Sequence, residues 1–302
     1  MITFSKEPKI GITGARGRYA PLLAEYLRGK GARVVTFSRL AGEGHEDLQS
    51  LLHPPTLARM DVLLHFGWGT VPKVAEEKQG AEWQKDLPFL SKLLKSFSQL
   101  AEKEKPYFLF PSTGAVYGEC GEQPVTEEAP LNPKSYYAAG KVAAEELLQQ
   151  HVVHGGGKVG IFRISNLYGA LGRSRVPQGV IAKLWECSQK KGSPKIWGDG
   201  SATKDYLHVT DFCEAVVSFL ERQLVGTWNL CTGTSHSLRD LLFIFSKELN
   251  WNTKCDFLPH PSWDVEKTNL SPQKLISATG WRPKTTLEHG VRELLSAPPN
   301  PF

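Results

Sequence analysis

The sequence contains few cysteines, and their arrangement argues against two classes of protein. Only five of the 302 residues are cysteine, an odd number (Cys120, Cys187, Cys213, Cys231 and Cys255). No two of them form a C-x-x-C pair, and none has the neighbouring histidine spacing of a zinc site. We therefore expect neither a disulfide framework nor a bound metal, and this cysteine usage fits a reducing compartment.

Long apolar runs and runs of like charge are also missing. No segment reaches the roughly 18 consecutive apolar residues of a membrane-spanning helix, and the residues through Lys9 contain no signal-peptide stretch. The net charge is +5, but basic and acidic residues are interleaved and form no nucleic-acid-binding arm. We expect a cytoplasmic protein with no membrane or nucleic-acid partner, whose mild positive charge suits small anionic ligands.

The first half of the chain alternates strand-length apolar runs with segments of helical period. The expected strands are 10–13, 33–37, 62–66, 107–111 and 158–164, and the expected helices are 22–28, 83–100 and 137–150. Such alternation is typical of βαβ units on a parallel sheet. The sequence therefore predicts an α/β fold, a Rossmann-type doubly wound parallel sheet with a smaller C-terminal substrate-binding lobe.

A change of composition after Tyr168 marks the expected domain boundary. Gly, Pro and Arg accumulate through residues 169–179, and the later apolar runs are short. We expect residues 1–168 to form a dinucleotide-binding Rossmann domain that carries the catalytic residues. Residues 169–302 are expected to form mainly the substrate-binding lobe, with 205–221 and 227–231 as candidates to return to the Rossmann sheet. The Pro-rich end, 297–302, is expected to be a frayed tail.

A glycine-rich turn joins the first expected strand to the first helix at residues 10–20. Gly14 would permit the tight turn, Gly17 the approach of a pyrophosphate, and Ala20 close helix packing, with the phosphates at the positive end of the helix. The turn predicts a dinucleotide site, although a plain connector can have the same pattern. Further cofactor candidates lie in this turn and at the end of the strand 62–66 (Arg16, Arg18, Tyr19, Phe66 and Gly67).

The end of the second expected strand bears on the choice between NAD and NADP. A site that prefers NAD usually has an acid there to hold the ribose 2′-hydroxyl, but this chain has Ser38 and Arg39. Arg39, helped by Arg16, could bind a 2′-phosphate. The sequence therefore favours NADP over NAD, the alternative being a solvated arginine at a strand end.

Tyr137 and Lys141 form the expected catalytic pair. They are four residues apart at the start of a helix, so both side chains share one helical face. A tyrosine with a pKa near 10 is a poor base at neutral pH, but a neighbouring ammonium and a nearby nicotinamide cation favour the phenolate. Tyr137 can then exchange a proton with a substrate alcohol while a hydride moves to or from the cofactor, whose ribose Lys141 could also hold. Tyr136 lacks the four-residue step to Lys141.

A Tyr-x-x-x-Lys spacing alone often occurs by chance, but hydroxyl residues provide independent support. Ser112 and Thr113 follow the buried apolar strand and precede Tyr137 by about two dozen positions. A hydroxyl at this strand end could hydrogen-bond the substrate oxygen in both its alcohol and its ketone state.

Seven segments, in order along nearly the whole chain, resemble one family. Together they are similar to the extended short-chain dehydrogenase/reductases, specifically the nucleotide-sugar epimerase/dehydratase family. The segments are 13–17, 61–67, 112–118, 137–141, 163–169, 196–209 and 280–290. The resemblance implies that Tyr137 is the acid/base, Lys141 its partner and Thr113 the third member of a catalytic triad. It also implies that Asn166 lies near the substrate phosphates.

The chain departs from the family pattern at two phosphate contacts. Lys204 stands where the family typically has an arginine that binds the sugar-nucleotide diphosphate. The change is not conservative, because a lysine ammonium is a point charge and lacks the bidentate geometry of an arginine guanidinium. Residues 256–269 contain no arginine for a second contact, so His260 or Lys267 would have to substitute.

The residues after Thr113 favour one reaction over another. Family dehydratases have Thr-Asp-Glu there, whereas this chain has Gly114 and Ala115. We therefore expect an NAD(P)-dependent nucleotide-sugar epimerase, acting at C4 by transient hydride transfer. An NADP(H)-dependent reductase or dehydrogenase of a sugar or related alcohol is the alternative, followed by a non-catalytic dinucleotide-binding sensor. The sequence leaves open the nucleotide, the sugar and the quaternary state, for which a homodimer is one option.

Overall fold

A computed structural model describes residues 7–169, 179–251 and 254–296, which divide into two compact units. The first unit contains the residues through Val116 together with Ser135–Arg163 and Val216–Trp228. The second contains Tyr117–Lys134, Ile164–Ala215 and the residues from Asn229 onward. The expected tail at 297–302, and residues 170–178 of the segment rich in Gly, Pro and Arg, lie outside the described residues.

The first unit is built on a seven-stranded sheet with the strand order β10-β6-β5-β4-β1-β2-β3. Its strands are β1 (Lys9–Thr13), β2 (Arg33–Ser38), β3 (Glu46–Asp47), β4 (Val62–His65), β5 (Tyr107–Thr113), β6 (Val159–Ile164) and β10 (Gly226–Leu230). The central strand β1 runs parallel to both neighbours, so that Ile10 pairs with Val34 on one side and Val62 on the other. The Rossmann-type parallel sheet predicted from the sequence is confirmed.

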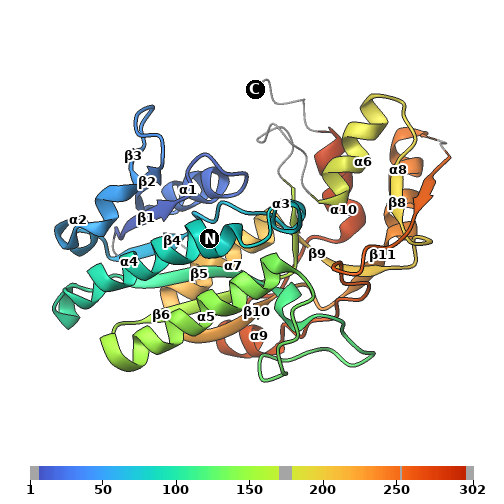
Figure 1. The fold of residues 1–302 in the computed structure, drawn as a ribbon. Coiled ribbons are helices and arrows are strands. Elements are labelled where there is room, and N and C mark those ends of the chain that lie inside the picture. The colour runs from blue at the N-terminus through green and yellow to red at the C-terminus, as the bar shows by residue number, and fades with distance from the viewer. Residues whose placement is uncertain (1–6, 170–178, 252–253, 297–302) are drawn as a thin grey trace. The chain divides into compact units, whose positions relative to one another are not determined.

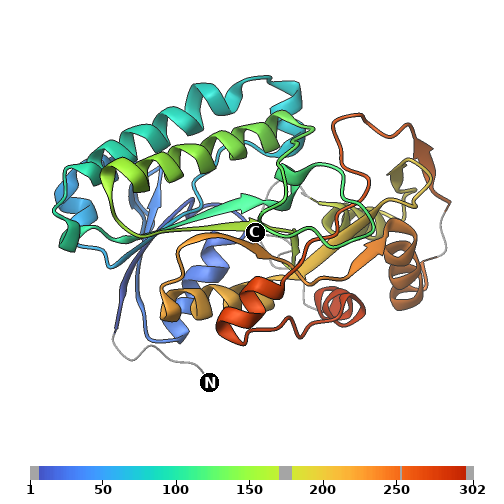
Figure 2. The same cartoon turned by 90° about the horizontal axis from the view of Figure 1, so that it is seen from below.

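Helices cover both faces of this sheet, as the apolar strands require. Helices α4 (Leu87–Ser98) and α5 (Tyr136–Gly155) lie side by side on one face, and α1 (Ala20–Gly29) lies on the other (Figures 1 and 2). Every residue of β4 and β6 is buried. The shorter helical segments of the first half are η1 (Leu48–Leu52), α2 (Pro54–Ala58), α3 (Pro72–Glu77), η2 (Glu82–Asp86), η3 (Glu102–Glu104) and η4 (Gly114–Tyr117).

The expected helix at 83–100 is divided in the structure. Residues Glu82–Asp86 form a single π-helical turn, η2, and the α-helix α4 begins only at Leu87. Pro88 lies in the first turn of α4, where its missing N–H costs nothing. An uninterrupted helix would have placed the same proline in its interior, where it clashes with the preceding turn.

The second unit contains two small sheets. Strands β7 (Asn166–Tyr168), β9 (Thr203–His208) and β11 (Ser235–Ser237) form one in the order β11-β9-β7, and β8 (Lys195–Trp197) pairs with β12 (Asp256–Leu258) in the other. The helices numbered after α5 are α6 (Val180–Gln189), α7 (Val209–Arg222), α8 (Leu238–Leu249), α9 (Gln273–Thr279) and α10 (Leu287–Ser296). Of the segments expected to return to the main sheet, 227–231 does so as β10, whereas β9 joins a small sheet. Within the described ranges, no helix is long and apolar enough to cross a membrane.

A buried ion pair ties α5 to the sheet. Glu145 on α5 and Arg163 on β6 are 1% and 4% exposed. The Arg163 guanidinium donates two hydrogen bonds to Glu145 Oε2, from Nε at 3.1 Å and from Nη2 at 2.7 Å. Ser112 on β5 donates its hydroxyl hydrogen to Glu145 Oε1. One carboxylate therefore joins α5 to two strands.

We expect Glu145→Gln to lower the free energy of unfolding by about 3–5 kcal/mol, because it leaves the Arg163 charge buried without its counterion. Urea unfolding followed by circular dichroism measures the change. Glu186→Gln is the control, since Glu186 pairs with Lys190 on the surface at 2.6 Å and exposed pairs contribute little. Equal effects of the two substitutions would contradict the expected role of the buried pair.

Candidate functional site

The glycine turn after β1 has the geometry of a dinucleotide cradle. Gly14 has φ +76°, and a Cβ atom there would lie 2.8 Å from the backbone oxygen of Phe66. A Cβ on Gly17 would lie 2.9 Å from the oxygen of Gly14, whose carbonyl accepts the Gly17 N–H at 2.7 Å. Both positions therefore need glycine for conformation or close approach. The exposed backbone at the start of α1 fits a bound pyrophosphate.

Thr13 and His65 hold the ends of β1 and β4 together beside this turn. Thr13 Oγ1 accepts the Gly67 N–H at 2.7 Å and lies 2.9 Å from His65 Nδ1. Burial, followed by the nearby Lys141, lowers the pKa of His65 to about 3, so the imidazole is neutral at physiological pH. Through these contacts Thr13 fixes the backbone at Phe66 and Gly67, two of the predicted cofactor residues, without using a charged group.

The other predicted cofactor residues surround the same turn. Tyr19 is the N-terminal cap of α1, and burial raises its pKa against the opposing influence of Arg18. Ser38 is buried at the end of β2, where its hydroxyl oxygen accepts the Leu40 N–H at 3.2 Å. Arg39 is exposed. Arg16 forms an ion pair of 3.0 Å with Glu43, so an acid already faces one of the two arginines expected to hold a 2′-phosphate.

The predicted catalytic pair, Tyr137 and Lys141, lies on the first two turns of α5. Ser135 caps the helix by accepting the Ala138 N–H at 3.1 Å, and so sets the helix to begin at Tyr136. Lys141 Nζ lies 5.9 Å from the centroid of the Tyr137 ring. The ammonium also donates a hydrogen bond of 2.8 Å to the backbone oxygen of Pro111 on β5. The predicted four-residue step therefore brings the two side chains together.

The proton affinity of Tyr137 differs from the sequence-based expectation. We expected Lys141 to favour the phenolate, but burial, followed by Asp86 and Glu82, raises the pKa of Tyr137 above its ordinary value. Burial is the largest cause and the two acids add to it, so Tyr137 is a phenol at neutral pH. Lys141 itself is 2% exposed, and burial lowers its pKa to about 7 against the opposing charges of Asp86 and Glu145.

Thr113, the third predicted member, ends β5 two residues after the carbonyl that binds Lys141. Its hydroxyl oxygen accepts the Ala115 N–H at 3.2 Å. Ser112, the other candidate, donates its hydroxyl hydrogen to Glu145 Oε1. The structure therefore separates the two strand-end hydroxyls and leaves Thr113 as the one able to act as a donor to a substrate oxygen.

Sequence reasoning missed the residues that surround Lys141. Trp68 lies after β4 with its ring centroid 4.1 Å from Lys141 Nζ, and Phe110 of β5 lies at 4.5 Å. Glu82 and Asp86 are buried on η2. The sequence shows Trp68 and Gly69 after the strand, and it shows Glu82 and Asp86 four residues apart. Their relation to Lys141 depends on packing between distant segments.

The second unit contains the two predicted substrate residues. Asn166 begins β7 and donates its side-chain amide to the backbone oxygen of Asp205 at 3.0 Å. Lys204 on the neighbouring β9 forms an ion pair of 3.4 Å with Asp264. The proposed substitutes for the missing arginine are also paired: His260 Nε2 lies 3.4 Å from Asp264, and Lys267 pairs with Glu122 at 2.5 Å. Each basic candidate for a diphosphate thus already faces a carboxylate.

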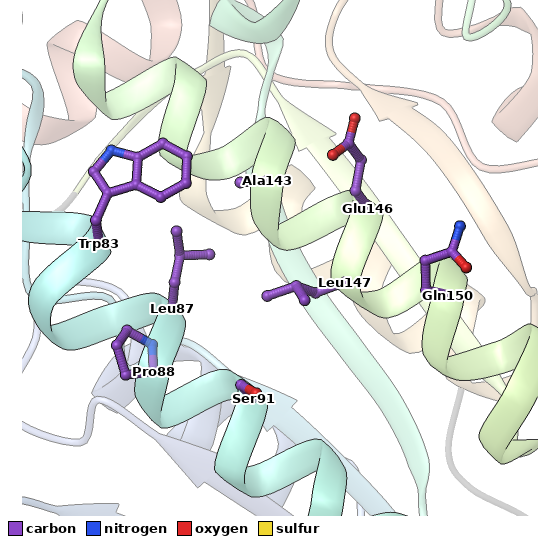
Figure 3. Close-up of a pocket in the computed structure, with 8 residues that line it drawn as sticks. All are labelled: Trp83, Leu87, Pro88, Ser91, Ala143, Glu146, Leu147 and Gln150. Atoms are coloured by element: carbon purple, nitrogen blue, oxygen red, sulfur yellow. The ribbon is translucent and has the colours of Figure 1, made fainter.

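A shallow apolar groove runs between α4 and α5, outside the predicted site. Figure 3 shows its lining, which comes from η2 and α4 on one side and from α5 on the other (Trp83, Leu87, Pro88, Ser91, Ala143, Glu146, Leu147 and Gln150). None of the predicted catalytic, cofactor or substrate residues lines it. Among the residues placed in the structure, no group of His, Cys, Asp and Glu side chains is arranged to hold a metal ion.

Sequence comparison assigns most of the chain to a known family. Residues 10–231 match the profile described as the NAD dependent epimerase/dehydratase family. The chain is 31% identical over 187 residues to a putative UDP-glucose 4-epimerase of Methanocaldococcus jannaschii, covering 61% of this chain and 60% of that protein. It is 25% identical to UDP-glucuronic acid decarboxylase 1 of Arabidopsis thaliana, covering 96% of this chain and 70% of that protein.

A solved structure agrees with this assignment. The UDP-glucose 4-epimerase of Thermus thermophilus, in complex with NAD, superimposes with a TM-score of 0.84 at 27% identity, covering 95% of this chain and 97% of that one. The chain belongs to the NAD-dependent epimerase/dehydratase family of sugar-nucleotide enzymes, within the extended short-chain dehydrogenase/reductases. The resemblance drawn from the seven sequence segments is confirmed.

Proposed function

We propose that this enzyme is an NAD(P)-dependent nucleotide-sugar epimerase that inverts C4 by transient hydride transfer. The observation that carries the proposal is the pairing of Tyr137 with Lys141 in the same unit as the glycine cradle, with Thr113 on the strand that Lys141 binds. The relatives that match include proteins named as UDP-glucose 4-epimerases. Gly114 and Ala115 after Thr113 supply neither the acid nor the base of a dehydratase.

The residues of the chain divide the reaction between proton transfer and positioning. The cradle of Gly14 and Gly17 would hold the pyrophosphate of the dinucleotide, which supplies a hydride acceptor and donor when bound. As a phenolate, Tyr137 would take the proton of the C4 hydroxyl as that carbon is oxidised and so become a phenol, and it would return the proton when the ketone is reduced from the other face. The Lys141 ammonium would stabilise the phenolate that exists before the oxidation and again after the reduction. Thr113 donates a hydrogen bond to the same substrate oxygen in its ketone state.

A reductase or dehydrogenase of a related sugar alcohol is the second candidate. It uses the same triad, but the cofactor must exchange between its two redox forms, a task for which NADP(H) often serves. Ser38 and Arg39 at the end of β2 support this candidate because no acid is present there to bind a ribose 2′-hydroxyl. The Arg16–Glu43 ion pair and the NAD bound by the Thermus relative weigh against it.

The quaternary state was left open by the sequence, with a homodimer as one option. Trp83, 49% exposed, borders the apolar groove between α4 and α5. We propose this face as the contact between two copies.

The cofactor preference is tested by calorimetric titration of NAD(H) and NADP(H). If Arg39 binds a 2′-phosphate, NADP(H) binds more tightly than NAD(H), and Arg39→Ala reduces the affinity for NADP(H) roughly tenfold while leaving NAD(H) unchanged. Arg33→Ala, at the exposed other end of β2, is the matched control. Tighter binding of NAD(H), with no effect of Arg39→Ala on NADP(H), would overturn the preference.

The reaction is tested with UDP-glucose as the substrate probe and its C4 epimer as the measured product. Tyr137→Phe removes only the phenolic hydroxyl, so turnover should fall by about 10²–10⁴ while the affinity for the nucleotide sugar is retained. Tyr136→Phe is the control and should turn over at the native rate. Release of reduced cofactor without any epimer would favour the dehydrogenase instead, and native turnover in Tyr137→Phe would contradict the assignment of the acid/base.

The substrate class is tested through Lys204. If its ammonium contacts a diphosphate, Lys204→Ala weakens the binding of UDP by about tenfold or more and leaves the weak binding of uridine unchanged. Lys195→Ala on the edge strand β8 is the control for loss of a positive charge in the second unit. An equal effect on both ligands, or none on either, would mean that Lys204 serves only its ion pair with Asp264.

A further inference from the structure

The indole ring of Trp68 lies over the ammonium of Lys141. Its centroid is 4.1 Å from Lys141 Nζ, and the centroid of the Phe110 ring on β5 is 4.5 Å from the same atom. The two rings meet edge to face, with centroids 5.7 Å apart and an interplanar angle of 70°. A cation is attracted by the negative face of an aromatic ring, and most strongly by that of tryptophan.

The ammonium has few polar contacts within the fold. Lys141 is buried, and it donates a hydrogen bond of 2.8 Å to the backbone oxygen of Pro111. A lysine ammonium carries three N–H donors, and burial removes the water that would otherwise surround them. The faces of Trp68 and Phe110 therefore supply part of the attraction that this charge loses on leaving water.

The titratable groups on the neighbouring strand and helix do not replace the rings. Glu145, one turn further along α5, is paired with Arg163 at 2.7 Å. His65 on β4 is neutral, and Tyr137 is a phenol. Neither His65 nor Tyr137 therefore offers a negative charge to the Lys141 ammonium at neutral pH.

The backbone on both sides of Trp68 is fixed by hydrogen bonds. Before it, the Gly67 N–H donates to Thr13 Oγ1 at 2.7 Å. After it, the Gly69 N–H donates to Asp86 Oδ1 at 2.8 Å, and the hydroxyl of the following threonine donates to Oδ2 at 3.3 Å. Asp86 on η2 is thus a carboxylate near the lysine with both oxygens engaged, and it anchors the segment that carries the indole.

Gly140, the residue before Lys141, lets the indole reach the catalytic helix. A Cβ atom at Gly140 would lie 3.6 Å from Trp68 Cζ2 and 2.8 Å from Cγ of the buried Glu82 on η2. The indole N–H is buried and has no hydrogen-bond partner in the part of the chain that the structure describes. The place of the ring is therefore set by packing and by the ammonium that it faces.

We propose that Trp68 is a positioning residue whose ring face holds the Lys141 ammonium against the Pro111 carbonyl, beside Tyr137. The catalytic meaning of this inference rests on the proposed function. A lysine ammonium lies at the end of a flexible four-carbon stem, so the place of Lys141 on α5 does not by itself fix Nζ. The indole supplies this restraint, and it favours the charged amine because a ring face attracts a cation.

The direct test follows the titration of Lys141 by NMR in the full-length protein. Lysine labelled with ¹³C at Cε reports protonation, and the Lys141 signal is identified by its absence in Lys141→Arg. Burial lowers the pKa of Lys141 to about 7, so loss of a ring that only excluded water would raise the midpoint. We expect Trp68→Leu to lower it instead, by roughly one pH unit, because leucine keeps the site apolar but has no ring face. Trp68→Phe retains a ring face and should keep the midpoint near that of the native protein.

Trp83→Leu is the matched control, because Trp83 lies on η2 with its side chain 49% exposed and should not affect Lys141. A midpoint that rises or stays unchanged in folded Trp68→Leu overturns the inference. If that variant does not fold, ¹⁵N-labelled tryptophan is used, and the indole signal of Trp68 is identified by its absence in Trp68→Phe. This signal should titrate with the Lys141 midpoint in the native protein and lose that titration in Lys141→Met. An indole signal that does not titrate is then the contradicting outcome.

Activity separates this inference from the proposed function. With UDP-glucose as the substrate probe, Trp68→Leu should lower kcat about tenfold, the rate equivalent of one buried cation–π contact, and leave KM unchanged. Trp68→Phe should recover most of the loss. Equal losses in both variants would indicate that only the size of the side chain matters, and would count against the inference. Absence of turnover in the native enzyme, with the Lys141 midpoint lowered in Trp68→Leu, refutes the proposed substrate and supports the hold of Trp68 on the ammonium.

Discussion

The buried carboxylate of Glu145 is the contact on which the catalytic geometry depends. It accepts hydrogen bonds from Arg163 on β6 and Ser112 on β5, and so anchors α5 one turn after Lys141. A helix packed only through apolar side chains could rotate or slide by a fraction of a turn at little cost. Two directional bonds to neighbouring strands remove that freedom, because a buried ion pair tolerates no separation of its partners. One turn earlier on α5, the Lys141–Pro111 hydrogen bond joins the same helix to β5.

The same ion pair affects the charge balance of the site. Since Arg163 neutralises Glu145, the carboxylate next to Lys141 contributes less net field than its proximity suggests. Burial lowers the proton affinity of Lys141, and burial, followed by Asp86 and Glu82, raises that of Tyr137. The fold therefore places a phenol beside a lysine whose ammonium readily loses its proton. If Tyr137 acts as proposed, the positive charge of an oxidised nicotinamide would favour the phenolate.

Sequence patterns predicted those parts of the molecule that depend on local periodicity. The alternation of apolar runs predicted the succession of strands and helices along the chain and the parallel sheet, and the step from Tyr137 to Lys141 placed two side chains on one helical face. The prediction of a helix at 83–100 was wrong in its first turn, because the α-helix begins only at Leu87, with Pro88 in its first turn. The two acids of η2 were overlooked for that reason. Their meaning depends on Gly140 and Trp68, which approach only through tertiary packing. The burial of Tyr137, which raises its pKa, also results from tertiary packing.

Substrate recognition is less predictable than redox chemistry because it depends on which acid faces each base. Lys204, His260 and Lys267 looked like phosphate ligands in the sequence, yet Asp264 faces the first two and Glu122 the third. An ammonium already paired with a carboxylate attracts a diphosphate less strongly than a bare one, and the incoming anion must compete with or displace the carboxylate. Asp264 therefore disfavours the binding of a diphosphate at both Lys204 and His260. If the proposed diphosphate site lies at Lys204, the attraction of the basic side chains for the diphosphate must exceed the cost of disturbing their ion pairs with Asp264.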